Sequence, residues 1–222
     1  MGGVINVLTR DPNYSAGFKA GGAVYGKWMN EDMEKTGRGE VRLSNNKVAF
    51  LGGFTYNDFG NIVGGDTTGK QPFTGYSEYA ADAKLRVKLS DSKELIMAYQ
   101  YDKQRDVPRT DKLMNNYVQY HFDPQIRQLG YVRLKSNSKN KWTKQLTVTG
   151  SFGQSDESRI KQKEGSSKVE YENDLVNTWG ATAEVTSVPG KNWYFQTGLE
   201  FYFDKVNSDK SEQEDEIGRA HV

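Results

Sequence analysis

The chain has 222 residues, of which 35% are hydrophobic, and its 30 Lys and Arg residues nearly balance its 29 Asp and Glu residues. The net charge of +1 gives no support for a nucleic-acid partner, because proteins that bind nucleic acids concentrate basic residues. The absence of cysteine excludes disulfides and thiolate chemistry. No apolar run approaches the ~18 residues that a transmembrane helix needs.

The first segment is Met1-Gly2-Gly3-Val4-Ile5-Asn6-Val7-Leu8-Thr9-Arg10-Asp11-Pro12, in which two glycines precede a short alternating stretch. This segment resembles the closing strand of the plug domain of TonB-dependent outer-membrane receptors. The resemblance implies that residues 1–12 end a plug domain. The rest of the plug, with the coupling box that contacts a TonB-type energy-coupling protein, would then lie upstream. We therefore expect the chain to be a fragment of a longer receptor.

From residue 13 onward, apolar and polar residues alternate with a period of two, which predicts an all-β chain. In segment 79–89, for example, Leu85 and Val87 fall on one side of the strand and Lys84 and Arg86 on the other. The alternation predicts nine strands: 14–28, 38–44, 48–56, 79–89, 95–101, 127–135, 146–152, 168–188 and 193–203.

The connections between these strands alternate in length. Four are short and polar, and the links between them are longer, which is the layout of outer-membrane barrels. The short connections are 44–47, 90–93, 136–141 and 188–192, and the long ones are 57–78, 102–126 and 154–167. The predicted fold for residues 13–215 is therefore part of a transmembrane antiparallel β-barrel. The resemblance to TonB-dependent receptors implies roughly twenty-two strands in the intact barrel, of which this chain would supply about nine.

The energetics of a bilayer decide which face of these strands meets lipid. A Lys or Arg at the lipid midplane costs about 2–4 kcal/mol. Lys84 and Arg86 are therefore predicted to face an aqueous lumen, and Leu85 and Val87 to face lipid.

The resemblance to the receptor family continues in segments 54–60 (FTYNDFG), 74–79 (TGYSEY) and 100–111 (QYDKQRDVPRTD). These are similar to the early barrel of receptors for haem, haemoglobin, siderophores and cobalamin. The resemblance implies that the intact protein binds a scarce nutrient, foremost an iron complex such as a siderophore or haem. It would import this small-molecule or haemoprotein-derived ligand across the outer membrane of a Gram-negative bacterium, surrounded by lipid and without a resident cofactor.

Six residues in the long links are the candidate ligand contacts: Phe59, Phe73, Tyr76, Tyr117, Tyr120 and His121. In a haem receptor, His121 or a neighbouring tyrosine could supply an axial ligand to iron. The simpler interpretation is a loop histidine without a ligand. Other aromatic residues at strand ends are interpreted as an interfacial girdle that flanks the lipid band. They are Trp28, Tyr56, Tyr79, Trp142, Trp193 and Tyr194.

The sequence offers no catalytic set, because it lacks cysteine and has a single histidine before residue 216. The stretch 64–70 (GGDTTGK) approaches a phosphate-binding loop but runs into Gln71 and Pro72 instead of a helix. The acidic run 212–216 is interpreted as a solvated loop. We therefore expect a protein that is not an enzyme, with a passive porin or adhesin barrel and a soluble β-sandwich binding module as the competing classes.

The last residues, 216–222, include the string Ile-Gly-Arg-Ala-His-Val. This string resembles the translation of a sequencing-library adapter. We expect the tail to carry no function, with a natural charged tail as the alternative.

Overall fold

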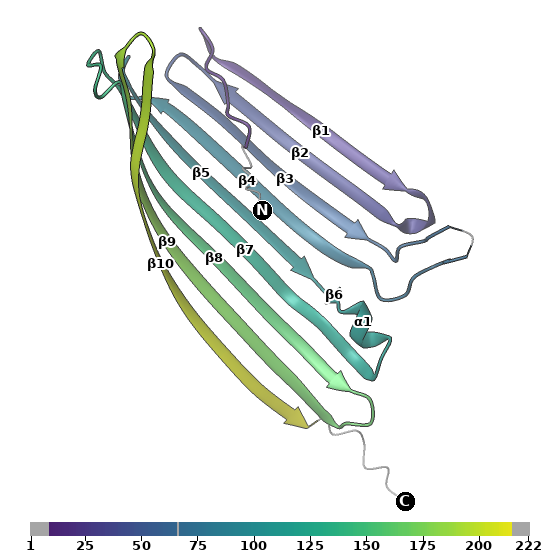
Figure 1. Cartoon of the computed structure of the whole chain (residues 1–222). Coiled ribbons are helices and arrows are strands. Elements are labelled where there is room, and N and C mark those ends of the chain that lie inside the picture. The colour runs from purple at the N-terminus through teal and green to yellow at the C-terminus, as the bar shows by residue number, and fades with distance from the viewer. Residues whose placement is uncertain (1–8, 66, 215–222) are drawn as a thin grey trace, which may run out of the picture.

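The computed structural model describes residues 9–65 and 67–214. These residues form one antiparallel sheet in which each long strand pairs with the next along the chain, in the order β1-β2-β3-β4-β5-β7-β8-β9-β10. The two-residue strand β6 adds to β7 only. The all-β prediction is confirmed, and over the described residues the sheet is open, with β1 and β10 at its edges (Figure 1).

All nine predicted strands are present, and most are longer than the alternation indicated. The first is shorter, because the strand begins at Lys19 and not at residue 14. Their bounds are β1 (Lys19–Met29), β2 (Glu34–Ser44), β3 (Val48–Phe59), β4 (Tyr76–Lys88), β5 (Lys93–Arg105), β7 (Tyr117–Asn137), β8 (Gln145–Lys163), β9 (Lys168–Gly190) and β10 (Trp193–Glu214). Between β5 and β7 lie β6 (Val107–Pro108) and the single-turn helix α1 (Thr110–Leu113).

The connections gather at two opposite ends of the sheet (Figure 1). One end, which we call the turn end, holds the links β2–β3, β4–β5, β7–β8 and β9–β10, which are the four short connections that the sequence predicted. The other end, which we call the loop end, holds the longer links 60–75 and 106–116 with β6 and α1. The four predicted short connections therefore do share one end of the sheet. The loop end nevertheless also holds two links of four residues each, 30–33 and 164–167, so the expected alternation of short and long connections is present only in part.

All three predicted long links are wrong in extent, and 57–78 changes least, because β3 and β4 leave 60–75 between them. Residues 117–126 belong to β7, and residues 154–163 belong to β8, so the expected links 102–126 and 154–167 shrink to 106–116 and 164–167.

Segment 154–163 is polar on both faces apart from Ile160 and gives almost no period-two signal. In segment 117–126 the alternation does continue, with Val118, Tyr120, Phe122 and Ile126 against polar residues, so the prediction of a loop there overlooked a local signal. The backbones of both segments are paired with neighbouring strands. The acidic residues Glu212–Glu214 likewise belong to β10 and not to a loop.

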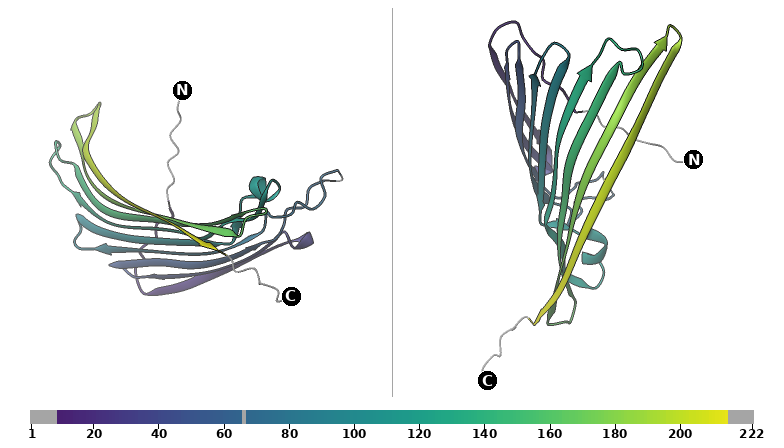
Figure 2. Two further views of the ribbon diagram at one scale, coloured as in Figure 1. Left: turned by 90° about the horizontal axis from the view of Figure 1, so that it is seen from below. Right: turned by 90° about the vertical axis from the view of Figure 1, so that its left-hand side faces the viewer.

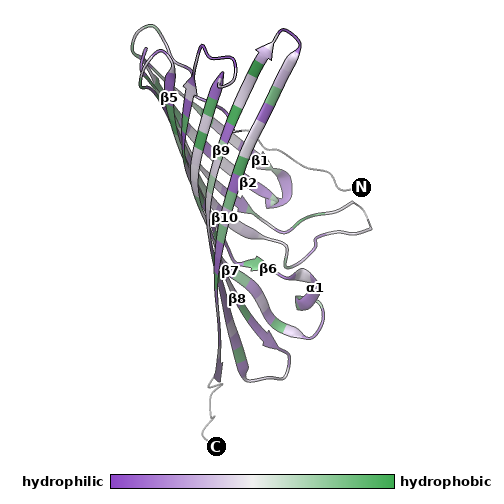
Figure 3. Ribbon diagram, turned by 60° about the vertical axis from the view of Figure 1, so that its left-hand side comes forward, coloured by the Kyte–Doolittle hydropathy of each residue, from purple (hydrophilic) through white to green (hydrophobic). Residues whose placement is uncertain are grey.

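The sheet curves into a trough (Figure 2). We call the face that carries Lys84 the concave face and the face that carries Leu85 the convex face. The described part of the N-terminal segment, residues 9–16, lies against the concave face. Figure 3 shows that hydrophobic residues recur along the turn-end parts of β9 and β10, whereas their loop-end tips are mainly hydrophilic.

Few side chains are buried, because no second sheet packs on either face among the described residues. The buried hydrophobic residues are Ala49, Leu51, Ile96, Tyr120 and Val169. Lys84 is the one buried charged residue of the described part of the chain. No helix of residues 9–65 and 67–214 has the length and apolar character to cross a membrane.

Candidate functional site on the concave face

The concave face of β2–β5 carries charged side chains that pair between strands. Arg86 Nη2 of β4 lies 2.7 Å from Glu94 Oε1 of the adjacent strand β5, because antiparallel register places every second residue of adjacent strands on one face. Arg38 of β2 instead crosses β3 above Gly53, and its Nη1 lies 2.8 Å from Asp82 Oδ1 of β4. The predicted division between Lys84 and Arg86 on one face and Leu85 and Val87 on the other is thus present in the sheet.

The N-terminal segment is fixed to this face chiefly by Lys84, which is only 7% exposed. Its ammonium donates to Thr9 O at 3.1 Å, to Thr9 Oγ1 at 2.6 Å and to Asp11 Oδ1 at 2.8 Å. Arg86 Nη1 donates to Pro12 O at 3.0 Å. A buried ammonium is tolerated only when its donors are satisfied, so these contacts hold residues 9–12 in one position.

Two further contacts extend this attachment. The Tyr14 hydroxyl donates to Glu94 Oε1 at 2.8 Å, and Arg10 forms an ion pair with Glu40. Partial burial by itself would raise the pKa of the Asp11 carboxyl, but the hydrogen bond and charge of Lys84 outweigh burial and lower it below its ordinary value. Asp11 therefore stays ionised in mildly acidic solution. Residues 1–8, which include most of the predicted plug strand, lie outside the described residues.

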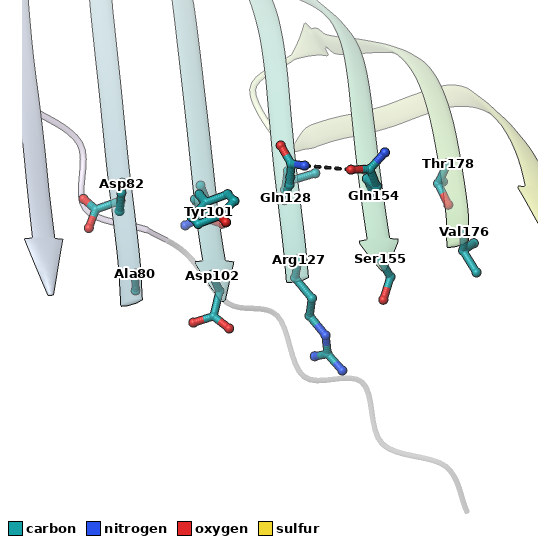
Figure 4. Close-up of a pocket in the computed structure, with 14 residues that line it drawn as sticks. Ala80, Asp82, Tyr101, Asp102, Arg127, Gln128, Gln154, Ser155, Val176 and Thr178 are labelled. Atoms are coloured by element: carbon teal, nitrogen blue, oxygen red, sulfur yellow. Dashed lines mark hydrogen bonds between the residues drawn. The ribbon is translucent and has the colours of Figure 1, made fainter. Parts of the chain in front are cut away.

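A hollow of about 530 Å³ lies further along the concave face, toward the loop end (Figure 4). Small residues such as Ala80 and Gly153 leave this space open, and Leu129 and Val176 line part of it. Its polar lining comes from neighbouring strands. These polar residues are Asp82, Gln100, Asp102, Arg127, Ser155 and Thr178.

Three of the candidate ligand contacts lie at the loop end between β3 and β4. The rings of Phe59 and Tyr76 are 4.8 Å apart, on paired positions that end these two strands. Phe73 lies in the 60–75 link, and its carbonyl accepts a hydrogen bond from Thr110 Oγ1 at 2.6 Å. That bond joins the two longest connections of the loop end.

The second aromatic group lies on β7 and not in a loop, which corrects the prediction for Tyr117, Tyr120 and His121. A register irregularity between residues 117 and 119 brings Tyr117 and Tyr120 onto one face, with ring centres 5.1 Å apart. The Arg109 guanidinium lies over the Tyr120 ring at 5.6 Å. Phe122 continues the group, with its ring centre 6.3 Å from that of Tyr120.

His121 faces the opposite side from Tyr120, because successive residues of a strand alternate. It pairs with Pro108 of β6 and Ile160 of β8. The structure thus separates His121 from the tyrosines that were expected beside it. No group of three or more His, Cys, Asp or Glu suited to a metal occurs in residues 9–65 and 67–214.

The loop-end parts of β8, β9 and β10 carry a second set of ion pairs on the concave face. Lys161 Nζ lies 2.7 Å from Glu172 Oε1 and 3.3 Å from Glu170 Oε2, and Lys210 Nζ lies 2.7 Å from Glu170 Oε2. Hydrogen bonds from Lys210 and from Lys161 lower the pKa of Glu170 and of Glu172, respectively.

Sequence reasoning missed the roles of Lys84, Asp102 and Arg127. Alternation showed which face these residues occupy, but only the strand register shows which charges have partners. Comparison of the chain with models of known protein families, with curated proteins and with solved structures finds no match in any of the three.

Proposed function

We propose that this chain forms part of a transmembrane β-barrel of the TonB-dependent receptor type in the outer membrane of a Gram-negative bacterium. The observation that carries the proposal is the division of the sheet into an exposed apolar convex face and a charged concave face. A barrel strand alternates lipid-facing and lumen-facing residues in this way.

The convex face is apolar over a continuous band from β1 to β10. Val24 is 92% exposed, Leu199 81% and Phe201 67%, although a water-soluble chain gains free energy by burying such side chains. An exposed apolar surface that continues across every strand of a sheet indicates an apolar environment or partner. Lipid is the partner that covers such a band on every strand at once.

The band ends toward the loop end in aromatic residues. Phe152, Trp179 and Phe203 form a row across β8, β9 and β10, with ring-centre distances of 5.6 Å and 5.7 Å. The Tyr56 and Tyr79 rings lie 4.9 Å apart on β3 and β4. Aromatic rows at the limit of an apolar band are typical of the membrane interface and favour the girdle interpretation.

The intact protein would bind a scarce nutrient, foremost an iron complex such as a siderophore or haem, and import it with energy from a TonB-type partner. Two observations support a plugged lumen. The N-terminal segment lies on the concave face, and Lys84 and Arg86 hold it there. The links 60–75 and 106–116, with Phe59, Phe73, Tyr76, Tyr117 and Tyr120, would contribute ligand contacts on the extracellular side.

The competing classes of protein would require different features of the sequence and the sheet. A passive porin or adhesin shares the alternation but lacks the Gly-Gly-Val-Ile-Asn-Val segment. A soluble β-sandwich needs a second sheet packed ~10 Å from the first, and the described residues form a single sheet.

Single cysteines test the membrane assignment directly, because the chain has none of its own. Leu199→Cys and Glu200→Cys place thiols on adjacent residues of β10 that face opposite sides. In outer membranes, a membrane-impermeant thiol reagent should label Glu200→Cys and leave Leu199→Cys unlabelled until the membrane is dissolved. Leu85→Cys and Arg86→Cys repeat the comparison on β4, and water accessibility of both Leu85 and Leu199 would overturn the proposal.

A further inference from the structure

The hollow on the concave face contains an arginine, Arg127, that has no partner within residues 9–65 and 67–214. Arg127 has no hydrogen bond, ion pair or aromatic contact among the described residues. Each of the other arginines in that part of the chain has at least one such partner. Arg127 is exposed, and in Figure 4 its guanidinium extends away from the Gln128–Gln154 pair.

The nearest acidic group in the strand register is Asp102. Asp102 and Arg127 occupy paired positions of β5 and β7, yet their charged groups form no ion pair. The Asp102 carboxylate has no hydrogen bond from residues 9–65 or 67–214 either. On the same face, by contrast, Asp82 is paired with Arg38 at 2.8 Å. The register thus places two unpartnered opposite charges side by side at the hollow.

Other polar groups of the hollow are also free. Gln100 and Ser155, both on the concave face, have no side-chain hydrogen bond among the described residues. Thr178 differs, because its hydroxyl donates to Asp204 Oδ1 at 2.5 Å. A guanidinium, a carboxylate, an amide and a hydroxyl without partners among the described residues therefore line about 530 Å³ of space. The rest of the lining consists of small, apolar and aromatic residues and of polar groups that already have partners: Asp82, Thr178, Gln128 and Gln154.

We propose that this hollow binds a small hydroxycarboxylate or amino-carboxylate ligand, which places a carboxylate on Arg127 and a hydroxyl or ammonium donor on Asp102. A guanidinium binds carboxylates in a two-pronged geometry, and an ionised carboxylate accepts hydrogen bonds only. An isolated anion would be attracted by Arg127 but repelled by Asp102, so a ligand that carries both group types fits the pair best. Small ligand sites of this kind combine an apolar wall with a few converging polar groups.

The inference rests on the proposed function for its setting, since a lumen-facing hollow meets ligands that enter a pore. It is nevertheless tested by binding alone. Malate and succinate are suitable probes, because they share two carboxylates and differ by one hydroxyl. The full chain, refolded in detergent micelles with its β-sheet content verified by circular dichroism, should bind malate saturably and more tightly than succinate in calorimetric titrations.

Three variants sharpen the test. Arg127→Gln should weaken malate binding at least about tenfold, the loss expected for one charge-assisted contact. Arg133→Gln, on the same face of the same strand, should leave binding within about twofold, since Arg133 already donates to Thr149 at 3.0 Å. Asp102→Ala should strengthen succinate binding by removing a repulsive charge, and should abolish the preference for malate.

Three outcomes would overturn the inference. They are the absence of saturable malate binding to the folded chain, equal losses in Arg127→Gln and Arg133→Gln, and an unchanged malate preference in Asp102→Ala. None of these three outcomes would contradict the membrane assignment, because that assignment is tested by thiol labelling of the convex face. Conversely, a water-accessible Leu199 would overturn the membrane assignment without altering a malate titration.

Discussion

Two regions of the long strands have the same backbone pairing and opposite surface chemistry. In the turn-end half of β8–β10, the convex face carries Val148, Ala183 and Leu199. In the loop-end half, the same face carries Asp156, Asn173 and Asp209. The comparison shows that backbone pairing continues over the whole length of these strands. The side chains of the convex face, in contrast, change from apolar to polar partway along them.

The change occurs between adjacent rows of the sheet. The aromatic row Phe152–Trp179–Phe203 is followed by Gln154 and Asn177, whose side chains are hydrogen bonded at 2.9 Å. Amide side chains such as these form hydrogen bonds with one another and with water, so they suit an aqueous surface and not a lipid one. Under the proposed function, this step would mark the outer limit of the lipid band, and the tips of β7–β10 would lie in water.

The largest expected effect comes from placing a charge on each side of this limit. Leu199→Arg and Asn207→Arg are both convex-face substitutions on β10. Leu199→Arg should cost about 2–4 kcal/mol of folding free energy in a bilayer, and Asn207→Arg about 0–1 kcal/mol, because the penalty falls away from the midplane. Equilibrium unfolding of the complete barrel from lipid vesicles measures both, and equal costs would contradict the position of the boundary.

The second largest effect is expected on the concave face, where a substitution should release the N-terminal segment. Lys84→Ala removes a cation with three hydrogen bonds to residues 9 and 11, at an expected cost of about 1.5–3 kcal/mol. Residues 9–12 should then become accessible to protease while the sheet stays paired. Lys135→Ala, on the same face and without a side-chain hydrogen bond in the described part of the chain, is the matched control and should leave the cleavage pattern unchanged.

A smaller effect should follow acidification. The pKa values of Glu170 and Glu172 are lowered by hydrogen bonds from Lys210 and Lys161, so their pairing stabilises the folded state above the ordinary carboxyl pKa. That stabilisation is lost as the pH falls through the lowered values. Hydrogen exchange, corrected for intrinsic rates, should therefore accelerate in residues 168–174 between pH 5 and pH 2, and to a lesser degree in residues 180–186. Uniform acceleration along β9 would show that the tip does not respond separately.

The smallest effect concerns His121. Because its side chain faces away from Tyr120, we expect His121→Ala to leave the absorption spectrum of added haem unchanged. The affinity for haem should stay within about twofold of that of the parent protein. A lost Soret shift in this variant would instead restore His121 as an iron ligand.

The sequence by itself determined the all-β class, the nine strands and the positions of four short turns that share one end of the sheet. It also assigned opposite faces to Leu85 and Lys84, because a period of two needs only local residues to be read. It failed in 154–163, where both faces are polar and no contrast marks a strand, and it took 117–126 for a loop although apolar and polar residues alternate there. Only the tertiary structure gave the register that joins Lys84 to Thr9 and Asp11 and turns His121 away from Tyr120. The same register puts Arg127 beside Asp102 without an ion pair, as far as the described residues go. Such pairings depend on which strands meet and at what offset, and these long-range quantities are not contained in any single stretch of the chain.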